Sequence, residues 1–534
     1  AWDKLKELQE SGEALDVVVK GIVNGGAIAY VEGVRGFIPA SKLALNYVED
    51  TEEYLNKPLQ VQVIDVDKVI TLNKINIKNL KNVYNGSITF NKESKRETLK
   101  HVTGIYGQNG SGKTSIIDSL VLLKELLLGR KLSNDFIYLI SANKEDLILD
   151  FEFLMGLNDE NYKIFYEVEI SKVEENLNDT DDDNDKENPL IKITKEKISY
   201  SKLDNEKWTR KCDILNYEYE NKKIPFTPKK TYEEMVSKRK DNELDLKFQK
   251  EFSKRLCKSY IFNNDNIKLF ENTMTEDVEI VKIIKSMQYF AKYNLFIVEN
   301  DESGVINTFG IMPFSFRIED KDGMSTGVIA IKLFDITTID KTKLETLNKI
   351  IDQINIVVEN IIPNLNIELK NYGIETLKDG REGYRVQLLS NREGIEIPLK
   401  YESDGIKKII SILSALIAMY NNEKILLAVD ELDAGVFEYL LGEILDVIKD
   451  NCKGQFIFTS HNLRALEKLD KDSIVFTTTN PENRYIKFTS VKSTNNLRDF
   501  YYRDIMLGEQ DEPVYETTNN NDIALAFREA KFEI

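Results

Sequence analysis

The sequence has few of the residues that build disulfide frameworks and histidine metal centres. Its 534 residues include only three cysteines and two histidines. Cys212, Cys257 and Cys452 lie far apart and form no CxxC pair, which argues against a thiolate zinc site and a disulfide framework and fits a reducing cytoplasm. His101 and His461 are too few for a histidine-rich metal centre.

Long apolar runs and an excess of basic charge are also missing. No stretch approaches the ~20 apolar residues that span a bilayer, and no apolar core follows the charged opening at Trp2–Lys4. The net charge is −18, whereas a protein that neutralises many phosphates carries a basic surface. We therefore expect a cytoplasmic protein, in which any contact with DNA or RNA needs a local patch or a dimer groove.

The first 68 residues read differently from the rest. After a short helical pattern at Trp2–Glu10 come three compact alternating segments, at Leu15–Val23, Ala27–Val31 and Leu59–Val66. Glycines separate them, so the pattern predicts a small twisted β-barrel.

This segment resembles a known RNA-binding repeat. The runs VNGGAIAYVEGVRGFIPASKL and YLNKPLQVQVIDVDK are similar to the OB-fold repeat of ribosomal protein S-one. The resemblance implies RNA contacts by Tyr30, Arg35, Phe37 and Lys42, on an exposed strand face. The alternative is that Tyr30 and Phe37 fill the core, because barrel strands alternate inward and outward side chains. The next segment, Val69–Leu72, either closes this barrel or begins a new sheet.

A phosphate-binding loop follows. The run GQNGSGKT matches GxxxxGK[ST], with an apolar strand at Val102–Tyr106 before it and an amphipathic helix after it. A glycine-rich turn without function would not need this strand–loop–helix context. Backbone N–H groups and the helix N-terminus favour phosphate, Lys113 reaches the β- and γ-phosphates, and Thr114 ligates Mg²⁺. The predicted ATP-binding residues are Gly107, Gln108, Asn109, Gly110, Ser111, Gly112, Lys113, Thr114 and Ser115.

Acidic residues end a second buried strand. The apolar run ILLAV leads into Asp430 and Glu431, and such runs mark parallel strands whose carboxyl ends bind ligands. We predict that Asp430 holds Mg²⁺ through water and that Glu431 orients and deprotonates the attacking water. Another strand at Gln455–Thr459 leads to His461, which can reach the γ-phosphate.

A second anion site is predicted at Ser403 and Gly405, which begin a long apolar helix. Taken alone, this pattern is an ordinary N-cap. Between the phosphate-binding loop and the acidic pair, it has the position of the ATPase signature sequence.

The motifs GQNGSGKT, ESDGIKK, ILLAVDE, LDAG and TSHN, in this order, resemble the ABC-type ATPases of the RecF, SMC and overcoming-lysogenization-defect group. The stand-alone bacterial ATPases of genome-defence loci are similar in particular. The resemblance implies a homodimer that sandwiches two ATP molecules. In it, Ser403 and Gly405 would cap the ATP of the other protomer, Asp433 would lie at the seam, and a separate effector protein would receive the signal. The signature departs from the transporter form at Asp404, and no glutamine follows the phosphate-binding loop until Gln249.

Roughly 290 residues separate the phosphate-binding loop from the signature. They contain an acidic loop at 179–188, a charged helical segment at Tyr232–Cys257 and an amphipathic helix at Lys341–Ile361. The charged segment is too short for a long coiled-coil arm. The ~70 residues after His461 are few for a nuclease domain, and Leu497–Tyr502 reads as an interaction surface or a late core helix.

The predicted fold is an α/β P-loop ATPase with a mixed sheet, an α+β insertion and a small N-terminal OB-like β-barrel. The expected domains are 1–68 (barrel), 69–170 (N-lobe), 171–395 (insertion) and 396–534 (C-lobe). Three functions remain open: a dimeric ATP-driven switch in genome maintenance or phage defence, an RNA-associated ATPase, and a scaffold that binds ATP without hydrolysing it. The intact Glu431 counts against the scaffold.

Overall fold

The computed structural model divides the chain into two compact units, which are described separately. The first comprises Ala1–Val69 with Met155–Lys163 and Ser201–Arg210, and the second comprises the remainder. The structure describes residues 13–23, 26–31, 34–39, 43, 52–62, 69–90, 101–157, 160–173, 190–205, 207–239, 241–274, 278–300, 304–320, 323–377, 380–488, 496–507 and 510–530.

The first unit contains an antiparallel sheet with the strand order β3-β2-β1-β4. Its strands are β1 (Ala14–Val23), β2 (Gly26–Val31), β3 (Val34–Pro39) and β4 (Pro58–Gln62). The side chains of Val17, Val19, Ala27 and Ala29 are buried, in the alternation that a half-buried strand requires. The three predicted strands are thus confirmed, and within the described residues they form an open sheet. The predicted helix at 2–10 and residues 63–66 lie outside the described residues.

A large antiparallel sheet, formed mostly by residues of the second unit, has the strand order β13-β12-β10-β9-β8-β5-β6, and β11, which belongs to the first unit, pairs with the end of β10. Its strands are β5 (Ile70–Leu80), β6 (Val83–Thr89), β8 (Asp146–Leu157), β9 (Glu160–Lys172), β10 (Ile191–Asp204), β11 (Lys207–Trp208), β12 (Cys212–Glu218) and β13 (Phe226–Thr227). Since β5 starts at Ile70 and pairs antiparallel with β6, the segment Val69–Leu72 begins this sheet. Strands β10, β12 and β13 come from the range assigned to the insertion, and they extend the same sheet.

The second sheet is mostly parallel, in the order β14-β21-β22-β7-β23-β24, and only β24 runs antiparallel to its neighbour. Its strands are β7 (Val102–Tyr106), β14 (Leu295–Val298), β21 (Leu426–Val429), β22 (Gln455–Ser460), β23 (Ile474–Thr477) and β24 (Tyr485–Ile486). Every residue of β7, β21, β22 and β23 is buried, which explains why these strands read as continuous apolar runs. The predicted α/β fold with both parallel and antiparallel strands is confirmed.

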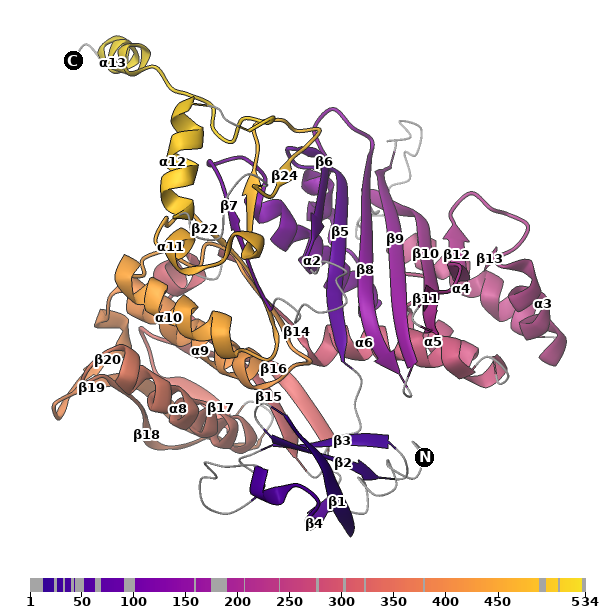
Figure 1. The fold of residues 1–534 in the computed structure, drawn as a ribbon, viewed down its shortest axis with the longest axis horizontal. Coiled ribbons are helices and arrows are strands. Elements are labelled where there is room, and N and C mark those ends of the chain that lie inside the picture. Colours follow the sequence, from indigo (N-terminus) through magenta and orange to yellow (C-terminus); the bar gives the residue numbers. More distant parts are fainter. Residues whose placement is uncertain are drawn as a thin grey trace. The chain divides into compact units, whose positions relative to one another are not determined.

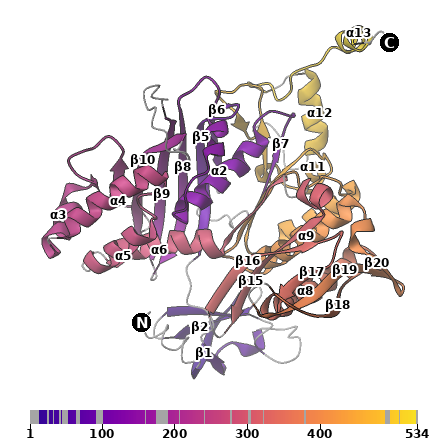
Figure 2. The same ribbon diagram turned by 180° about the vertical axis from the view of Figure 1, so that it is seen from behind.

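Helices cover both sheets. Those that flank the parallel sheet include α2 (Lys113–Leu127), α9 (Asp404–Asn421) and α10 (Glu438–Asn451) (Figure 1). The view from behind shows helices against one face of the antiparallel sheet (Figure 2), namely α4 (Asn242–Leu256), α5 (Asn264–Thr273) and α6 (Val278–Tyr293). The helix α8 has the predicted bounds, Lys341–Ile361. It packs beside a small sheet made of β17 (Thr337–Asp340), β18 (Asn366–Thr376), β19 (Glu382–Arg392) and β20 (Ile395–Pro398), and β15 (Ile311–Asp320) pairs with β16 (Gly323–Lys332) (Figure 1).

The helical character predicted for Tyr232–Cys257 is confirmed. The structure has two helices there, α3 (Lys229–Lys238) and α4. The backbone of Arg239 is extended, and the Arg239 guanidinium pairs with the Asp241 carboxylate at 3.2 Å. A polar stretch without a helix-stabilising apolar face thus ends the first helix.

The late helix α12 (Leu497–Leu507) belongs to the core. The Tyr501 ring stacks on Phe476 of β23, and Phe500 packs against Phe488. Of the two predicted roles for this segment, a core helix is therefore confirmed. No helix within the described residues has the length and apolar character to cross a membrane.

One buried carboxylate ties the antiparallel sheet to the connection between α4 and α5. Glu196 of β10 is fully buried and accepts hydrogen bonds from Tyr166 (2.8 Å), Ser259 (2.5 Å) and the backbone N–H groups of Tyr260 (2.8 Å) and Ile261 (3.2 Å). Burial raises the pKa of Glu196, and these hydrogen bonds oppose that rise.

We predict that Glu196→Ala lowers the free energy of unfolding by roughly 3 kcal/mol, because it leaves several buried donors without an acceptor. Urea unfolding followed by circular dichroism measures this loss. The matched control is Glu167→Ala on the neighbouring strand, which removes a partly exposed ion pair with Lys211 and should cost less than about 1 kcal/mol. Equal losses in both variants would contradict the proposed importance of the buried network.

Candidate nucleotide-binding site

The loop between β7 and α2 has the backbone of a phosphate cradle. Gly110 and Gly112 have φ of 74° and 91°, a region that favours glycine. A Cβ at Gly112 would also approach Val83 Cγ2 to 2.8 Å. Both conformation and space therefore require glycine at 112, directly before the first helical residue, Lys113.

The Lys113 ammonium lies inside this loop. Its Nζ donates to the carbonyl oxygens of Gly107 and Gln108, each at 2.9 Å. Burial lowers the pKa of Lys113 to about 8, while the carboxylates of Glu431 and Asp430 act in the opposite direction. A phosphate in the loop would offer the ammonium an anionic partner in place of two carbonyl oxygens.

Two strands brace the loop from the side, through residues that the sequence analysis did not identify. Ser111 Oγ donates to Gln108 O at 2.6 Å and lies 2.5 Å from Thr477 Oγ1, at the end of β23. Tyr485 of β24 donates its hydroxyl to Gly112 O at 2.7 Å. Only the strand order reveals these contacts, because more than 350 residues separate the partners.

Asp430 and Glu431 follow β21, and one hydroxyl holds them both. Thr459 Oγ1 donates to Asp430 Oδ1 at 2.6 Å and accepts the Glu431 N–H at 2.8 Å. Glu431 has φ of 46°, an uncommon conformation for a residue with a side chain. Asp430 is only 3% exposed, and the strained turn that follows it directs Glu431 into the pocket.

Thr114 approaches Asp430 across the site, with 3.4 Å between Thr114 Oγ1 and Asp430 Oδ1. A hydroxyl and a carboxylate are oxygen donors of the kind that Mg²⁺ selects. The two predicted metal-binding residues therefore lie together, and their donor chemistry fits this ion.

His461 lies at the carboxyl end of β22. Its backbone N–H donates to both carboxylate oxygens of Asp433, at 3.2 and 3.1 Å. Partial burial lowers the pKa of His461, the nearby Lys113 ammonium lowers it further, and the surrounding carboxylates oppose this. Because its pKa lies below the ordinary value of ~6.5, the imidazole is mainly neutral at pH 7.

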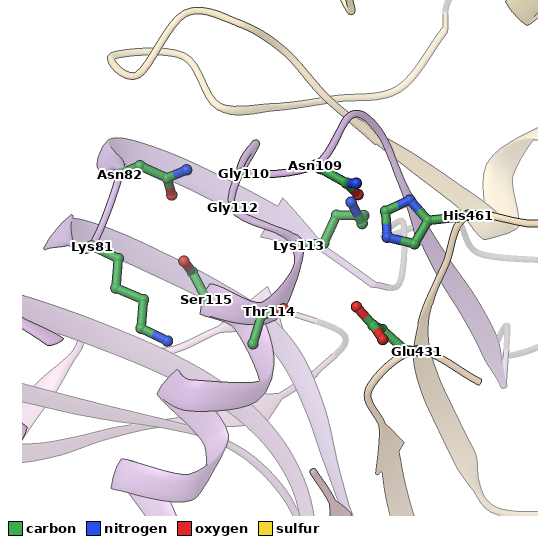
Figure 3. Close-up of a pocket in the computed structure, with 10 residues that line it drawn as sticks. All are labelled: Lys81, Asn82, Asn109, Gly110, Gly112, Lys113, Thr114, Ser115, Glu431 and His461. Atoms are coloured by element: carbon green, nitrogen blue, oxygen red, sulfur yellow. The ribbon is translucent and has the colours of Figure 1, made fainter. Parts of the chain in front are cut away.

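A cavity of ≈ 520 Å³ joins these groups. Figure 3 shows Lys113, Glu431 and His461 close together on one side, with the loop residues between them and the β5–β6 turn. The lining residues are Lys81, Asn82, Asn109, Gly110, Gly112, Lys113, Thr114, Ser115, Glu431 and His461.

Lys81 and Asn82 are additional pocket residues that the sequence analysis missed. They form the β5–β6 turn, in which Lys81 has φ of 51° and its Nζ lies 2.6 Å from Asp118 of α2. A polar turn after a strand is too common a pattern to indicate a ligand.

Ser403 and Gly405, both within the described residues, do not line this cavity. Ser403 caps α9, and its hydroxyl accepts the Ile406 N–H at 3.4 Å. Gly405 packs against the backbone of Gly435, so closely that a Cβ would lie 1.9 Å from Gly435 O. The Asp404 carboxylate pairs with Lys407 Nζ at 2.9 Å, which offsets the negative charge beside the helix N-terminus.

The RNA-contact candidates lie in the first unit. Tyr30 is on β2 with its side chain 51% exposed, so it does not fill a core within the described residues. In the β2–β3 register Arg35 pairs with Tyr30, and Phe37 pairs with Ile28. Lys42 lies outside the described residues.

Comparison with known proteins identifies two family matches. A family described as "AAA domain, putative AbiEii toxin, Type IV TA system" matches residues 102–467, and the S1 RNA binding domain matches residues 8–74. The chain is 48% identical over 68 residues to the small ribosomal subunit protein bS1 homolog of Bacillus cereus, which is 13% of this chain and 18% of that protein. The chain thus spans less than a fifth of the length of that relative. Both resemblances inferred from the motifs are confirmed.

Solved structures are similar at a lower level. A crystal structure of an SMC head bound to the C-winged helix domain of ScpA is 14% identical, with a TM-score of 0.39, and covers 78% of this chain and 98% of its own. A structure of the recombination mediator protein RecF with ATP is 14% identical, with a TM-score of 0.31, and covers 74% of this chain and 94% of its own.

We predict that Thr459→Val destabilises the second unit by about 2 kcal/mol, because the buried Asp430 carboxylate loses its donor and the Glu431 N–H loses its acceptor. The control Thr459→Ser keeps the hydroxyl and should lose less than half as much. Urea unfolding measures both variants. Valine keeps the threonine methyl group and lacks only the hydroxyl, so a valine variant as stable as the wild type would contradict the importance of the hydroxyl bridge.

Proposed function

The chain belongs to this AAA-domain family, and we propose that it binds ATP with Mg²⁺ and hydrolyses it as a head-to-tail dimer. In this proposal the dimer is a switch that acts with a separate effector protein in phage defence or genome maintenance. The family description names a type IV toxin–antitoxin system, which supports the defence role.

One observation carries the enzymatic part of the proposal. The same cavity is lined by Lys113 from the phosphate-binding loop and by Glu431 and His461 from the ends of β21 and β22. More than 300 residues of the chain separate Lys113 from the other two. A cradle for phosphate thus faces a carboxylate that can orient water and an imidazole that can contact the terminal phosphate.

The residues would divide the work as follows. The loop N–H groups and the Lys113 ammonium bind the β- and γ-phosphates and stabilise charge on the transferred group. Thr114 and Asp430 hold Mg²⁺, which neutralises phosphate charge when bound. Glu431 accepts a proton from the attacking water, and His461, mainly neutral at pH 7, donates a hydrogen bond to the γ-phosphate.

The position of Ser403 and Gly405 supports the dimer. The helix N-terminus is a good anion site, and Lys407 offsets the Asp404 charge beside it, yet neither Ser403 nor Gly405 lines the cavity of its own chain. In a dimer, the γ-phosphate of the ATP bound to a second copy would lie against this helix N-terminus.

An RNA-associated ATPase is the second candidate function. The exposed Tyr30 ring and the match to the S1 RNA binding domain favour it, since exposed aromatic side chains stack on bases. The first unit would then bind RNA, and the second would supply ATP-driven remodelling.

We predict that ATP affinity falls as the pH rises above 8. The ammonium form of Lys113 binds phosphate, and its pKa in the free protein is about 8. The affinity is therefore constant well below this pH. Above it, Lys113 must take up a proton when ATP binds, so the Kd should rise by up to about eightfold between pH 7.5 and 9.

Titration calorimetry with a non-hydrolysable ATP analogue measures this dependence. Burial also lowers the pKa of Lys250 to about 8, but Lys250 is absent from the cavity lining. The control variant Lys250→Arg should therefore keep the same pH profile. An affinity that does not change up to pH 9 would contradict a buried Lys113 as the titrating group.

We predict that the wild type hydrolyses ATP, that Lys113→Ala abolishes binding and turnover, and that Glu431→Gln binds ATP with turnover reduced at least 100-fold. Steady-state phosphate release, alone and with duplex DNA, single-stranded DNA or RNA, measures turnover. Stimulation by RNA that is lost in Tyr30→Ala would favour the RNA-associated function. Wild-type turnover no higher than that of Lys113→Ala would leave only an ATP-gated scaffold.

A further inference from the structure

The segment that leads to the chain's last described helix is fixed at the phosphate-binding loop. The backbone N–H of Glu516 donates to Gln108 Oε1 at 2.9 Å. A few residues earlier, Glu512 accepts hydrogen bonds from Asn480 (3.1 and 3.0 Å) and Asn483 (3.2 Å), and Val514 is buried. Residues 510–516 therefore pass along the edge of the nucleotide site in a defined position.

The helix that follows, α13 (Asn520–Glu529), has an apolar side but no buried residue. Ile523 and Phe527 are four positions apart and lie on the same side of the helix, and Phe527 is 79% exposed. An amphipathic helix whose residues are all exposed is typical of a segment that docks into another surface.

A matching surface surrounds the signature helix. Tyr401, Phe437 and Tyr439 are all exposed, and Phe437 is 73% exposed. They flank the contact at which the Gly405 backbone packs on Gly435, so they lie at the end of the unit that presents Ser403. We call Tyr401, Phe437 and Tyr439 the aromatic patch.

The charges on the two surfaces are complementary. Residues 510–530 include five acidic residues and one basic residue. Two rings of the aromatic patch have cations over them: Lys400 Nζ lies 4.8 Å from the Tyr401 ring centre, and the Arg464 guanidinium lies 5.3 Å from that of Tyr439. An acidic segment with an apolar helix thus suits an aromatic patch in which two of the three rings carry a cation over them.

We infer that α13 docks on the aromatic patch of a second copy and closes the ATP-dependent dimer as a clasp. This inference rests on the proposed head-to-tail dimer, in which the phosphate-binding loop of one copy faces the Ser403 helix of the other. The Gln108–Glu516 hydrogen bond holds the segment before α13 beside the phosphate-binding loop of its own copy, which is one side of that interface. The aromatic patch lies on the opposite side, in the second copy.

The test uses the full chain with Glu431→Gln, so that ATP is retained, and measures the dimer dissociation constant by sedimentation equilibrium with Mg²⁺ and ATP. The double change Ile523→Asp and Phe527→Asp should raise that constant at least tenfold. The control Leu525→Asp puts one carboxylate, half of the charge added by the double change, on the other side of α13 and should change the dimer dissociation constant less than twofold. ATP affinity, measured below the dimer concentration range, should be equal in all three proteins.

The outcomes separate the two proposals. If the Glu431→Gln protein with an intact tail forms no dimer in ATP, the proposed function and the clasp both fail. If the Glu431→Gln protein forms a dimer and the double change leaves its dissociation constant unchanged, only the clasp is overturned. That result is expected if α13 binds an effector protein instead of a second copy.

A crosslinking experiment tests the docking site directly. One copy carries Arg528→Cys, next to Phe527, and a differently tagged copy carries Glu438→Cys, next to Phe437, so that both docking side chains are kept; both copies carry Cys212→Ser, since the other two native cysteines are buried. A disulfide between the two copies that needs ATP supports the clasp. Equal crosslinking without ATP, or none between copies that do form a dimer, overturns it.

Discussion

The parallel pairing of β22 with β7 on one side and β21 on the other is the constraint on which the site depends. In its register Tyr106 pairs with Ser460, and Val429 pairs with Phe458. The carboxyl ends of three strands therefore meet at one edge of the sheet, which places the phosphate-binding loop, Glu431 and His461 around one cavity and Asp430 beside Thr114. Burial of all three strands on both faces stabilises this arrangement, because a change of register would bring polar strand ends into the core.

Within this frame, one threonine hydroxyl sets the geometry of both acids. Thr459 donates to Asp430 and accepts from the Glu431 backbone, and the positive φ of Glu431 is held by that second bond. Strain of this kind persists only where neighbouring contacts over-determine the conformation. The same closeness of charges determines the electrostatics: burial lowers the pKa of Lys113, and the acids across the cavity limit the decrease.

In the proposed dimer, the Ser403 helix has to be both rigid and accessible to a second copy. Its N-terminus packs on the Gly435 backbone, and Gly435 follows the Asp430–Glu431 turn by only a few residues. The signature surface is thus built on the same loop that places the acids. A change in the acidic turn would be transmitted to the surface that a second copy would meet, without any long chain of contacts.

The sequence by itself determined the local elements and the family. The strand–loop–helix context of GQNGSGKT, the apolar runs that end in Asp430 and His461, and the Ser403 N-cap follow from periodicity and spacing over short distances, and the structure reproduces these elements. The tertiary structure alone decided which distant residues support them. Thr477, Tyr485, Thr459 and the Lys81 turn act through strand order and sheet register, which no local pattern specifies. The pairing of β10, β12 and β13 with the first sheet was not predicted either, because charged and alternating patterns are compatible with several tertiary partners, and packing selects among them.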